Sequence, residues 1–158
     1  MNLKIAIALF IGVFIGAAIL AALVFVSAPH LMITENTSQH DFETTVTTLI
    51  ASAEGLGWKV PAVHRLHDSV GKAGIEVLPA AVVEVCNPKL AGRILADESS
   101  RVVTSMMPCR IGVYQREDGK VTVTRMNTGL VAKLFGGLVT TVMGEATTDS
   151  EAIISSVL

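Results

Sequence analysis

Aromatic side chains and clusters of basic residues are scarce in this sequence of 158 residues. It contains one Trp, one Tyr and five Phe, and its 12 Lys and Arg are outnumbered by 14 Asp and Glu, for a net charge of −2. Nucleic-acid binding needs clustered cations to neutralise phosphates and, for single strands, aromatic platforms that stack the bases. We therefore expect no nucleic-acid partner.

Cysteine is also rare: the chain has two, Cys86 and Cys109. No C-x-x-C or H-x-x-x-H spacing is present, and the glycines are scattered, with no phosphate loop and no dinucleotide-binding fingerprint. After the first 26 or so residues, roughly 130 remain, which is enough to bury a core without metals or disulfides as staples. We expect one domain in this part.

One long stretch contains no charged or strongly polar side chain, from Ile5 to Val26. It is slightly longer than the about 20 residues that a helix needs to cross the hydrocarbon core of a bilayer. The sequence therefore predicts a single-pass membrane protein. Residues 1–28 would form a transmembrane anchor in the lipid bilayer, and residues 29–158 one domain beside it.

The charges around this stretch predict its orientation. Lys4 and the amino terminus precede it, whereas no Lys or Arg occurs in residues 27–58. The positive-inside rule then places the N-terminus in the cytoplasm and the domain outside it, in the periplasm of a Gram-negative cell. The alternative is a signal peptide cleaved near Ala28, but the apolar run is long for one, and Pro29 would follow the cut.

Small residues recur four positions apart within the apolar stretch. Gly12 and Gly16 form a GxxxG motif, and such faces let two helices approach closely. Glycine is also common in spanning helices that pair with nothing. The motif leaves open a homodimer or a place in a larger membrane complex.

Two short motifs give the strongest local predictions in the remaining chain. Asn87 followed by Pro88 is typical of a helix start, with Asn as the N-cap and Pro as the first helical residue. Asp118-Gly119 between two alternating segments is typical of a β-hairpin.

Hydrophobic patterning predicts the other elements. Ser38 is expected to cap a helix that Gly55 and Gly57 end, and the class of residues 130–143 is left open. The other expected helices are residues 64–72, the helix after Asn87, and residues 150–158; the expected strands are residues 31–33, 58–63, 79–86, 101–104, 109–115 and 120–126. The fold class is therefore α+β, with a mostly antiparallel sheet covered by helices.

Several of these segments together resemble a known family. They are Glu84-Val85-Cys86-Asn87-Pro88 with its helix, Met107-Pro108-Cys109-Arg110-Ile111-Gly112-Val113-Tyr114, Asp118-Gly119-Lys120, the helix near residues 38–46, and the pair His67-Asp68. The pattern resembles the family called domain of unknown function 302, over roughly residues 31–135. The resemblance implies a small domain similar to the TATA-binding-protein-like class and no established reaction. Residues 136–158 match no pattern and receive no role.

The two cysteines are the natural candidates for chemistry. Cys86 stands just before the Asn-Pro helix start, and the N-terminus of a helix lowers the pKa of a nearby thiol. Cys109 alternates with Ile111 and Val113, which favours a core position, whereas Cys86 alternates with Glu84. In an oxidising compartment the two cysteines are candidates for a disulfide.

A metal site or a catalytic site would recruit histidines. The metal candidates are His64, His67 and Cys86, with Met106 and Met107 as further sulfur donors. The alternative is an exposed polar face for the histidines and a core position for the methionines.

Cysteine catalysis would need His67 and Asp68 beside Cys86. Neighbouring residues in a chain usually point apart, so no catalytic residue is assigned and an enzyme is not expected.

These observations leave three functions open. The first is a non-enzymatic, membrane-anchored, extracytoplasmic domain that binds a small ligand or a partner through Cys86, Cys109, His67 and Glu84. The second is a thiol-redox or metal-handling protein that uses Cys86 with Cys109 and His67. The third is an accessory subunit of a larger membrane complex, held through Gly12 and Gly16.

Overall fold

The computed structural model describes residues 3–158, except for the side chains of residues 3, 5, 6, 8 and 9. The amino terminus, which contributed to the predicted orientation, lies outside the described residues. The chain divides into two compact units, Met1–Met32 and Ile33–Leu158.

The first unit contains helix α1, Leu3–Met32. Within the described residues, one helix is long and apolar enough to cross a membrane, over the stretch Phe10–Met32 with a mean hydropathy of 2.7. The expected strand at residues 31–33 is wrong, because the helix continues to Met32 and the strand begins at Ile33. A short apolar run does not by itself distinguish a strand from the end of a helix.

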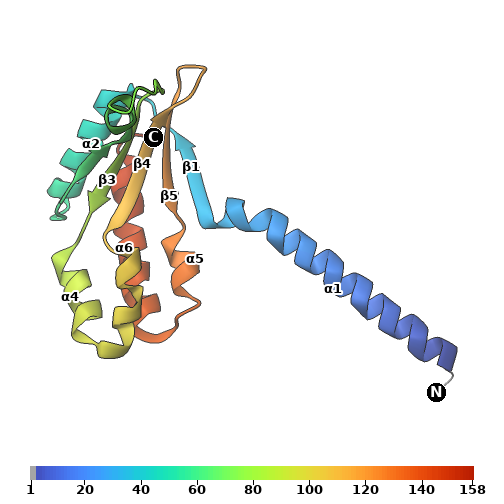
Figure 1. The fold of residues 1–158 in the computed structure, drawn as a ribbon. Coiled ribbons are helices and arrows are strands. Elements are labelled where there is room, and N and C mark those ends of the chain that lie inside the picture. Colours follow the sequence, from blue (N-terminus) through green and yellow to red (C-terminus); the bar gives the residue numbers. More distant parts are fainter. Residues whose placement is uncertain (1–2) are drawn as a thin grey trace. The chain divides into compact units, whose positions relative to one another are not determined.

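The second unit is built on a five-stranded antiparallel sheet (Figure 1). Its strands are β1 (Ile33–Thr37), β2 (Val63–Arg65), β3 (Ala80–Val85), β4 (Cys109–Gln115) and β5 (Val121–Met126), in the order β1-β5-β4-β3-β2. The hairpin of β4 and β5 is confirmed, and Gly119 takes a positive φ of 82° in its turn. The predicted α+β class is confirmed as well.

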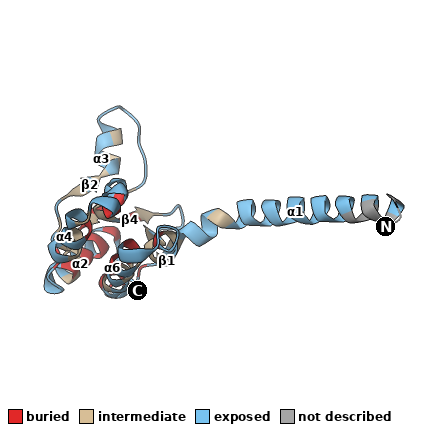
Figure 2. Ribbon diagram, turned by 90° about the horizontal axis from the view of Figure 1, so that it is seen from below, coloured by how far each residue is buried: buried red, intermediate tan, exposed pale blue. Residues whose placement is uncertain are grey.

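One face of the sheet carries the hydrophobic core. Side chains at alternate positions, including Val83, Val85, Ile111, Val113 and Val123, are fully buried. They pack against α2 (Phe42–Gly55) and α6 (Gly137–Ser155), which lie behind the sheet in Figure 1. Figure 2 shows the buried residues gathered between these helices and the strands. Because every buried core residue lies between Phe42 and Val157, residues 33–158 fold around a core of their own.

Two N-cap residues were predicted, Asn87 and Ser38, and one of them is confirmed. Asn87 caps α4 (Pro88–Ala96), since its Oδ1 accepts hydrogen bonds from the backbone N–H groups of Lys89 and Leu90 at 3.0 and 3.4 Å. Ser38 is not the cap of α2. That position belongs to Asp41, and the Ser38 hydroxyl is buried, where it donates to the carbonyl of Val157 at 3.0 Å.

The remaining elements correct four expectations. Residues 101–104 are not a strand, because they lie in the 3₁₀ helix η1 (Glu98–Met106), which Asp97 caps. Residues 58–63 form only a bridge between Lys59 and Cys86 before β2. The helix expected from residue 64 begins at Leu66 and is α3 (Leu66–Gly71). The helix expected from residue 150 is not separate, because residues 150–155 are the end of α6. A short helix, α5 (Thr128–Ala132), precedes α6.

A candidate binding pocket where two strands part

The central strands β4 and β5 separate at one end of the sheet. Their pairing begins at Ile111 and Arg125. Before that point, Cys109 and Arg110 pair with β3 on their other side, while Met126 pairs with Ile33 of β1. The two strands therefore diverge toward α5 and η1 and leave a gap in the sheet.

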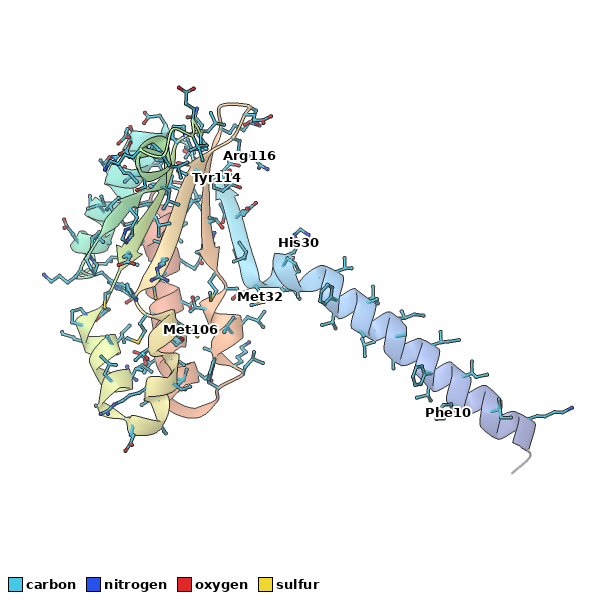
Figure 3. All side chains as sticks on the ribbon, in the orientation of Figure 1. Phe10, His30, Met32, Met106, Tyr114 and Arg116 are labelled. Carbon is cyan, nitrogen blue, oxygen red and sulfur yellow. The ribbon has the colours of Figure 1, made fainter. Side chains whose placement is uncertain are left out.

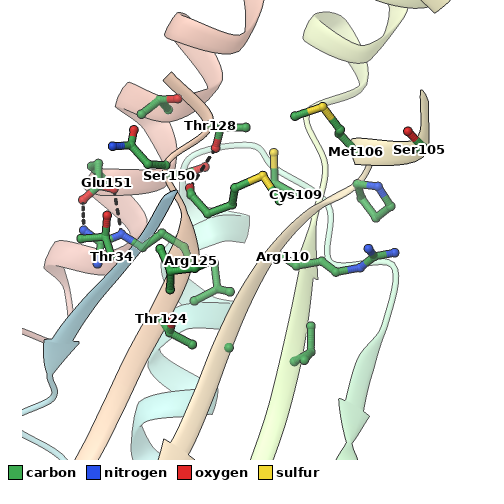
Figure 4. A pocket seen from close by; sticks show the side chains of 18 residues that line it. Thr34, Ser105, Met106, Cys109, Arg110, Thr124, Arg125, Thr128, Ser150 and Glu151 are labelled. Carbon is green, nitrogen blue, oxygen red and sulfur yellow. Dashed lines mark hydrogen bonds and ion pairs between the residues drawn. The ribbon is translucent and has the colours of Figure 1, made fainter. Parts of the chain in front are cut away.

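A cavity of about 570 Å³ occupies this gap, and we call it the strand-gap pocket (Figure 4). Its walls come from β1, β3, β4, β5, η1, α5 and α6, so residues distant in the sequence meet there. The apolar part of the lining is Ile33, Val82, Met106, Pro108, Ile111 and Met126, and the hydroxyl-bearing part is Thr34, Ser105, Thr124, Thr128, Thr147 and Ser150. The pocket is therefore lined by both apolar and hydroxyl-bearing side chains.

An ion pair closes the pocket on the side of α6. Arg125 is 10% exposed and faces Glu151, with its Nε donating to Oε1 at 2.8 Å and its Nη2 to Oε2. Its Nη1 donates to the side-chain oxygen of Asn36 on β1. The guanidinium group of Arg125 is therefore held by Glu151 and by Asn36. Its planar geometry gives this side of the pocket a fixed shape.

A second charged group lies at the rim. Arg110 donates from Nε to Oε1 of Glu84 at 3.2 Å, and Nε2 of His64 lies 3.3 Å from the same oxygen. Glu84 is 14% exposed, whereas Arg110 is 56% exposed and lines the pocket. The structure thus brings the predicted residues Glu84 and His64 together. Neither of them lines the pocket, but Glu84 contacts Arg110, which does.

The sheet is tight beside the pocket. A Cβ atom added at Gly112 on β4 would lie 2.7 Å from Cγ2 of Thr124 on β5. A contact of that length requires the Thr124 side chain or one of the two strands to move. Glycine at this position therefore lets β4 and β5 pair closely directly next to the place where they part.

Both cysteines line a second, much smaller cavity of about 30 Å³ between β3, α4 and α6, and Cys109 also lines the strand-gap pocket. Both are free thiols. Burial raises the pKa of Cys86, and burial together with the nearby Cys86 raises the pKa of Cys109. A raised pKa keeps a thiol neutral, so each cysteine acts as a small apolar side chain at neutral pH.

The expected lowering of the Cys86 pKa by the helix start is therefore wrong. The N–H groups at the start of α4 that would stabilise a thiolate already bind the side chain of Asn87. Burial, which disfavours the charged form, then sets the direction of the shift.

His67 lies at the other end of β3 from Cys86. Its Nδ1 is 2.9 Å from the carbonyl oxygen and 3.2 Å from the amide nitrogen of Ala80, and its ring meets Phe42 edge to face at 5.5 Å. These contacts fasten α3 to the start of β3. The structure therefore does not bring His67 to either cysteine.

The three metal candidates are also kept apart. His64 is on β2, His67 is on α3, and Cys86 follows the far end of β3. Among residues 3–158, no group of three or more His, Cys, Asp and Glu side chains could hold a metal ion. Gly12 and Gly16, the residues of the predicted helix-pairing motif, lie on α1.

One feature of the sequence indicates the pocket. In β5, Arg125 shares its alternation with the buried Val121 and Val123, so a charged side chain stands on the core face of the sheet. Such a residue needs a partner. Glu151, on a helix far along the chain, has no sequence pattern that marks it as that partner.

Comparison with known proteins places the second unit in a family. The family model described as "Domain of unknown function DUF302" matches residues 34–157. No curated protein matches the chain. Three solved chains match it.

One of these solved chains is an uncharacterized conserved protein DUF302 from Bacillus stearothermophilus. It is 18% identical, with a TM-score of 0.72, over 81% of this chain and 99% of that chain. At that identity the likeness shows the fold alone. The match of the family model over most of the chain shows more: the protein belongs to the DUF302 family, as the paired motifs around Cys86 and Cys109 indicated.

Proposed function

We propose that this protein is a membrane-tethered domain that binds a small, mainly apolar ligand in the strand-gap pocket. The observation that carries the proposal is the cavity of about 570 Å³ where β4 and β5 part. Ligand sites are typically concave, about 300–1,000 Å³ in volume and lined by apolar side chains with a few polar groups. Both the size and the lining of this pocket fit that description.

The lining also favours a class of ligand. Ile33, Val82 and Met126 offer apolar contact, and Cys109 adds to it because its thiol stays neutral. Arg125 already forms an ion pair with Glu151 and a hydrogen bond to Asn36, so its charge does not need to be neutralised by an anionic ligand. Recognition would therefore rest on shape and apolar contact, with hydroxyls of threonine and serine orienting the ligand.

Binding is tested on residues 33–158, which fold around a core of their own. The probe is N-phenyl-1-naphthylamine, an uncharged apolar dye that fluoresces when it leaves water. The test variant is Ser150→Trp, which fills the pocket, and its control is Ser155→Trp, an exposed position on the same helix.

The wild-type domain and Ser155→Trp should bind the dye saturably, and Ser150→Trp should bind it at least about tenfold more weakly. Thermal unfolding checks that both variants are folded. The proposal fails if the wild-type domain shows no saturable binding, or if the two variants bind equally well.

The tether and its orientation form the second part of the proposal. The stretch Phe10–Met32 supports a span, and Lys4 before it, with no Lys or Arg in residues 27–58, supports an extracytoplasmic domain. Asp118→Cys in the exposed hairpin turn and Asn2→Cys near the N-terminus, which leaves Lys4 in place, are compared in a background where Cys86 and Cys109 are alanine. A membrane-impermeant maleimide should label position 118 on intact cells and position 2 only after lysis. The reverse pattern would contradict the orientation.

A further inference from the structure

Exposed apolar side chains gather at one end of the second unit. Leu134 is 86% exposed and Phe135 46% exposed, in the turn between α5 and α6. Leu130, Leu138, Met126 and Ile33 are exposed nearby along the chain or across the β1–β5 pairing. We call these six residues the apolar end. Soluble surfaces seldom group large apolar side chains in this way unless they contact a membrane or another protein.

The register of the sheet places Ile33 and Met126 at one end, and the chain continues from there into α5. Ile33 at the start of β1 pairs with Met126 at the finish of β5, and α5 begins two positions later, at Thr128. The turn of β4 and β5 at Asp118-Gly119 lies at the opposite end of the sheet. Figure 3 shows the two ends, with Tyr114 and Arg116 toward the hairpin and Met106 toward the other.

The chain enters the second unit at this same end. Ile33 directly follows Met32, which closes the apolar stretch Phe10–Met32. A helix of that length rises about 35 Å at 1.5 Å per residue, slightly more than the hydrocarbon core of a bilayer. If the stretch spans the membrane, covalent continuity alone keeps Ile33 close to the lipid headgroups.

The charge of the segment that carries most of the apolar end also fits a lipid surface. The sequence from Met126 to Gly144 contains no Asp or Glu and one cation, Lys133, next to Leu134. The hairpin turn at the opposite end is charged instead, with Arg116, Glu117 and Asp118 in a row. Apolar side chains beside a lysine are typical of segments that lie at the bilayer interface.

We infer that the apolar end docks on the bilayer, with Leu134 and Phe135 inserted below the headgroups and Lys133 beside the lipid phosphates. The inference goes beyond ligand binding, because it holds whether or not the strand-gap pocket is filled. It also has a consequence for the pocket, since Ile33 and Met126 belong both to the pocket lining and to the apolar end. A docked domain would open its pocket toward the membrane surface.

The first test uses the full chain in vesicles of phosphatidylcholine and phosphatidylglycerol at a ratio of 3:1, with and without brominated acyl chains, which quench tryptophan on contact. Leu134→Trp is compared with Glu117→Trp in the hairpin turn. Trp58 is 2% exposed and gives the same background in both proteins. Quenching should lower the added fluorescence of Leu134→Trp by about twofold or more and leave that of Glu117→Trp unchanged. Equal quenching at the two positions would overturn the inference.

The second test separates lipid from protein partners and uses residues 33–158. Leu134→Glu with Phe135→Glu is compared with Ile75→Glu and Val77→Glu, which change two other exposed apolar residues in the loop before β3. The wild-type domain and the loop variant should sediment with the same vesicles, and the Leu134/Phe135 variant about fivefold less. The inference would be wrong if the wild-type domain did not sediment with vesicles but formed a concentration-dependent dimer through Leu134 and Phe135.

Discussion

Arg125 on β5 and Glu151 on α6 form an ion pair that joins the sheet to its covering helix, with Nε of the arginine 2.8 Å from Oε1 of the glutamate. The arginine is almost fully buried, whereas the glutamate is half exposed. The pair lies where β4 and β5 begin to part, and both of its residues line the strand-gap pocket. It therefore holds α6 against the sheet at this side of the pocket.

Removal of the charge of Glu151 should destabilise the domain. Glu151→Gln leaves the guanidinium of Arg125 buried beside a neutral amide, and we expect a loss of about 1–2 kcal/mol in the free energy of unfolding, less than for a fully buried pair because Glu151 reaches water. Urea unfolding measures the loss. The control is Glu145→Gln on the same helix, which breaks the exposed pair with Arg93 and should change stability less. Equal losses in the two variants would contradict the role of Arg125.

Close pairing at Gly112 gives the second prediction. Gly112→Ala brings a methyl group 2.7 Å from Cγ2 of Thr124 and should cost about 1–2 kcal/mol through overpacking. Thr124→Ser removes that methyl group, so the double variant should recover most of the loss. Gly92→Ala in α4, where the added methyl group meets nothing within 4 Å, should instead stabilise by up to about 1 kcal/mol. A double variant no more stable than Gly112→Ala would show that the contact is not the cause.

The sequence predicted the parts of the fold that local patterns determine. Asn87-Pro88 and Asp118-Gly119 fix a helix start and a hairpin through backbone chemistry within a few residues, and both are confirmed. Residues 101–104 looked like a strand because they include two valines, yet the Asp97 cap and tertiary packing made them helical. Local propensity is weaker than packing for short segments.

The candidate site was predicted only in part. Cys109 lines the strand-gap pocket, but Cys86, Glu84 and His67 do not. A pocket made by the divergence of two strands depends on where their pairing stops, and apart from the charged Arg125 on the core face no residue pattern in β4 or β5 marks that position. Residues such as Ser150 and Glu151 join the lining from a helix that covers the sheet, which only the tertiary structure reveals.

The third prediction concerns a buried hydroxyl on β5. Thr122 is 1% exposed, and its Oγ1 has no hydrogen-bond partner among the described residues. Thr122→Val replaces that hydroxyl with a methyl group of similar size, which should raise the free energy of unfolding by about 1 kcal/mol. Thr37→Val, the same change at the exposed strand partner of Thr122, serves as the control and should alter stability less. A loss of stability in Thr122→Val would mean that the hydroxyl is bonded in solution.

The last prediction follows from the buried thiols and concerns alkaline pH. Burial raises the pKa of Cys109 above that of an unfolded thiol, about 8.5, and the nearby Cys86 raises it further. Below that pH both states are protonated and the contribution to stability is complete. Above it, the unfolded chain loses the proton while the folded domain keeps it, so the free energy of unfolding falls, by at most about 1.4 kcal/mol per pH unit for one thiol.

Urea unfolding with reductant, at several pH values between about 7.5 and 9.5, measures this decline. The decline should be smaller in Cys109→Ala than in the wild-type domain, because the substituted protein has one buried thiol fewer. Parallel declines in the two proteins would show that the thiol of Cys109 has the same pKa in the folded and the unfolded chain.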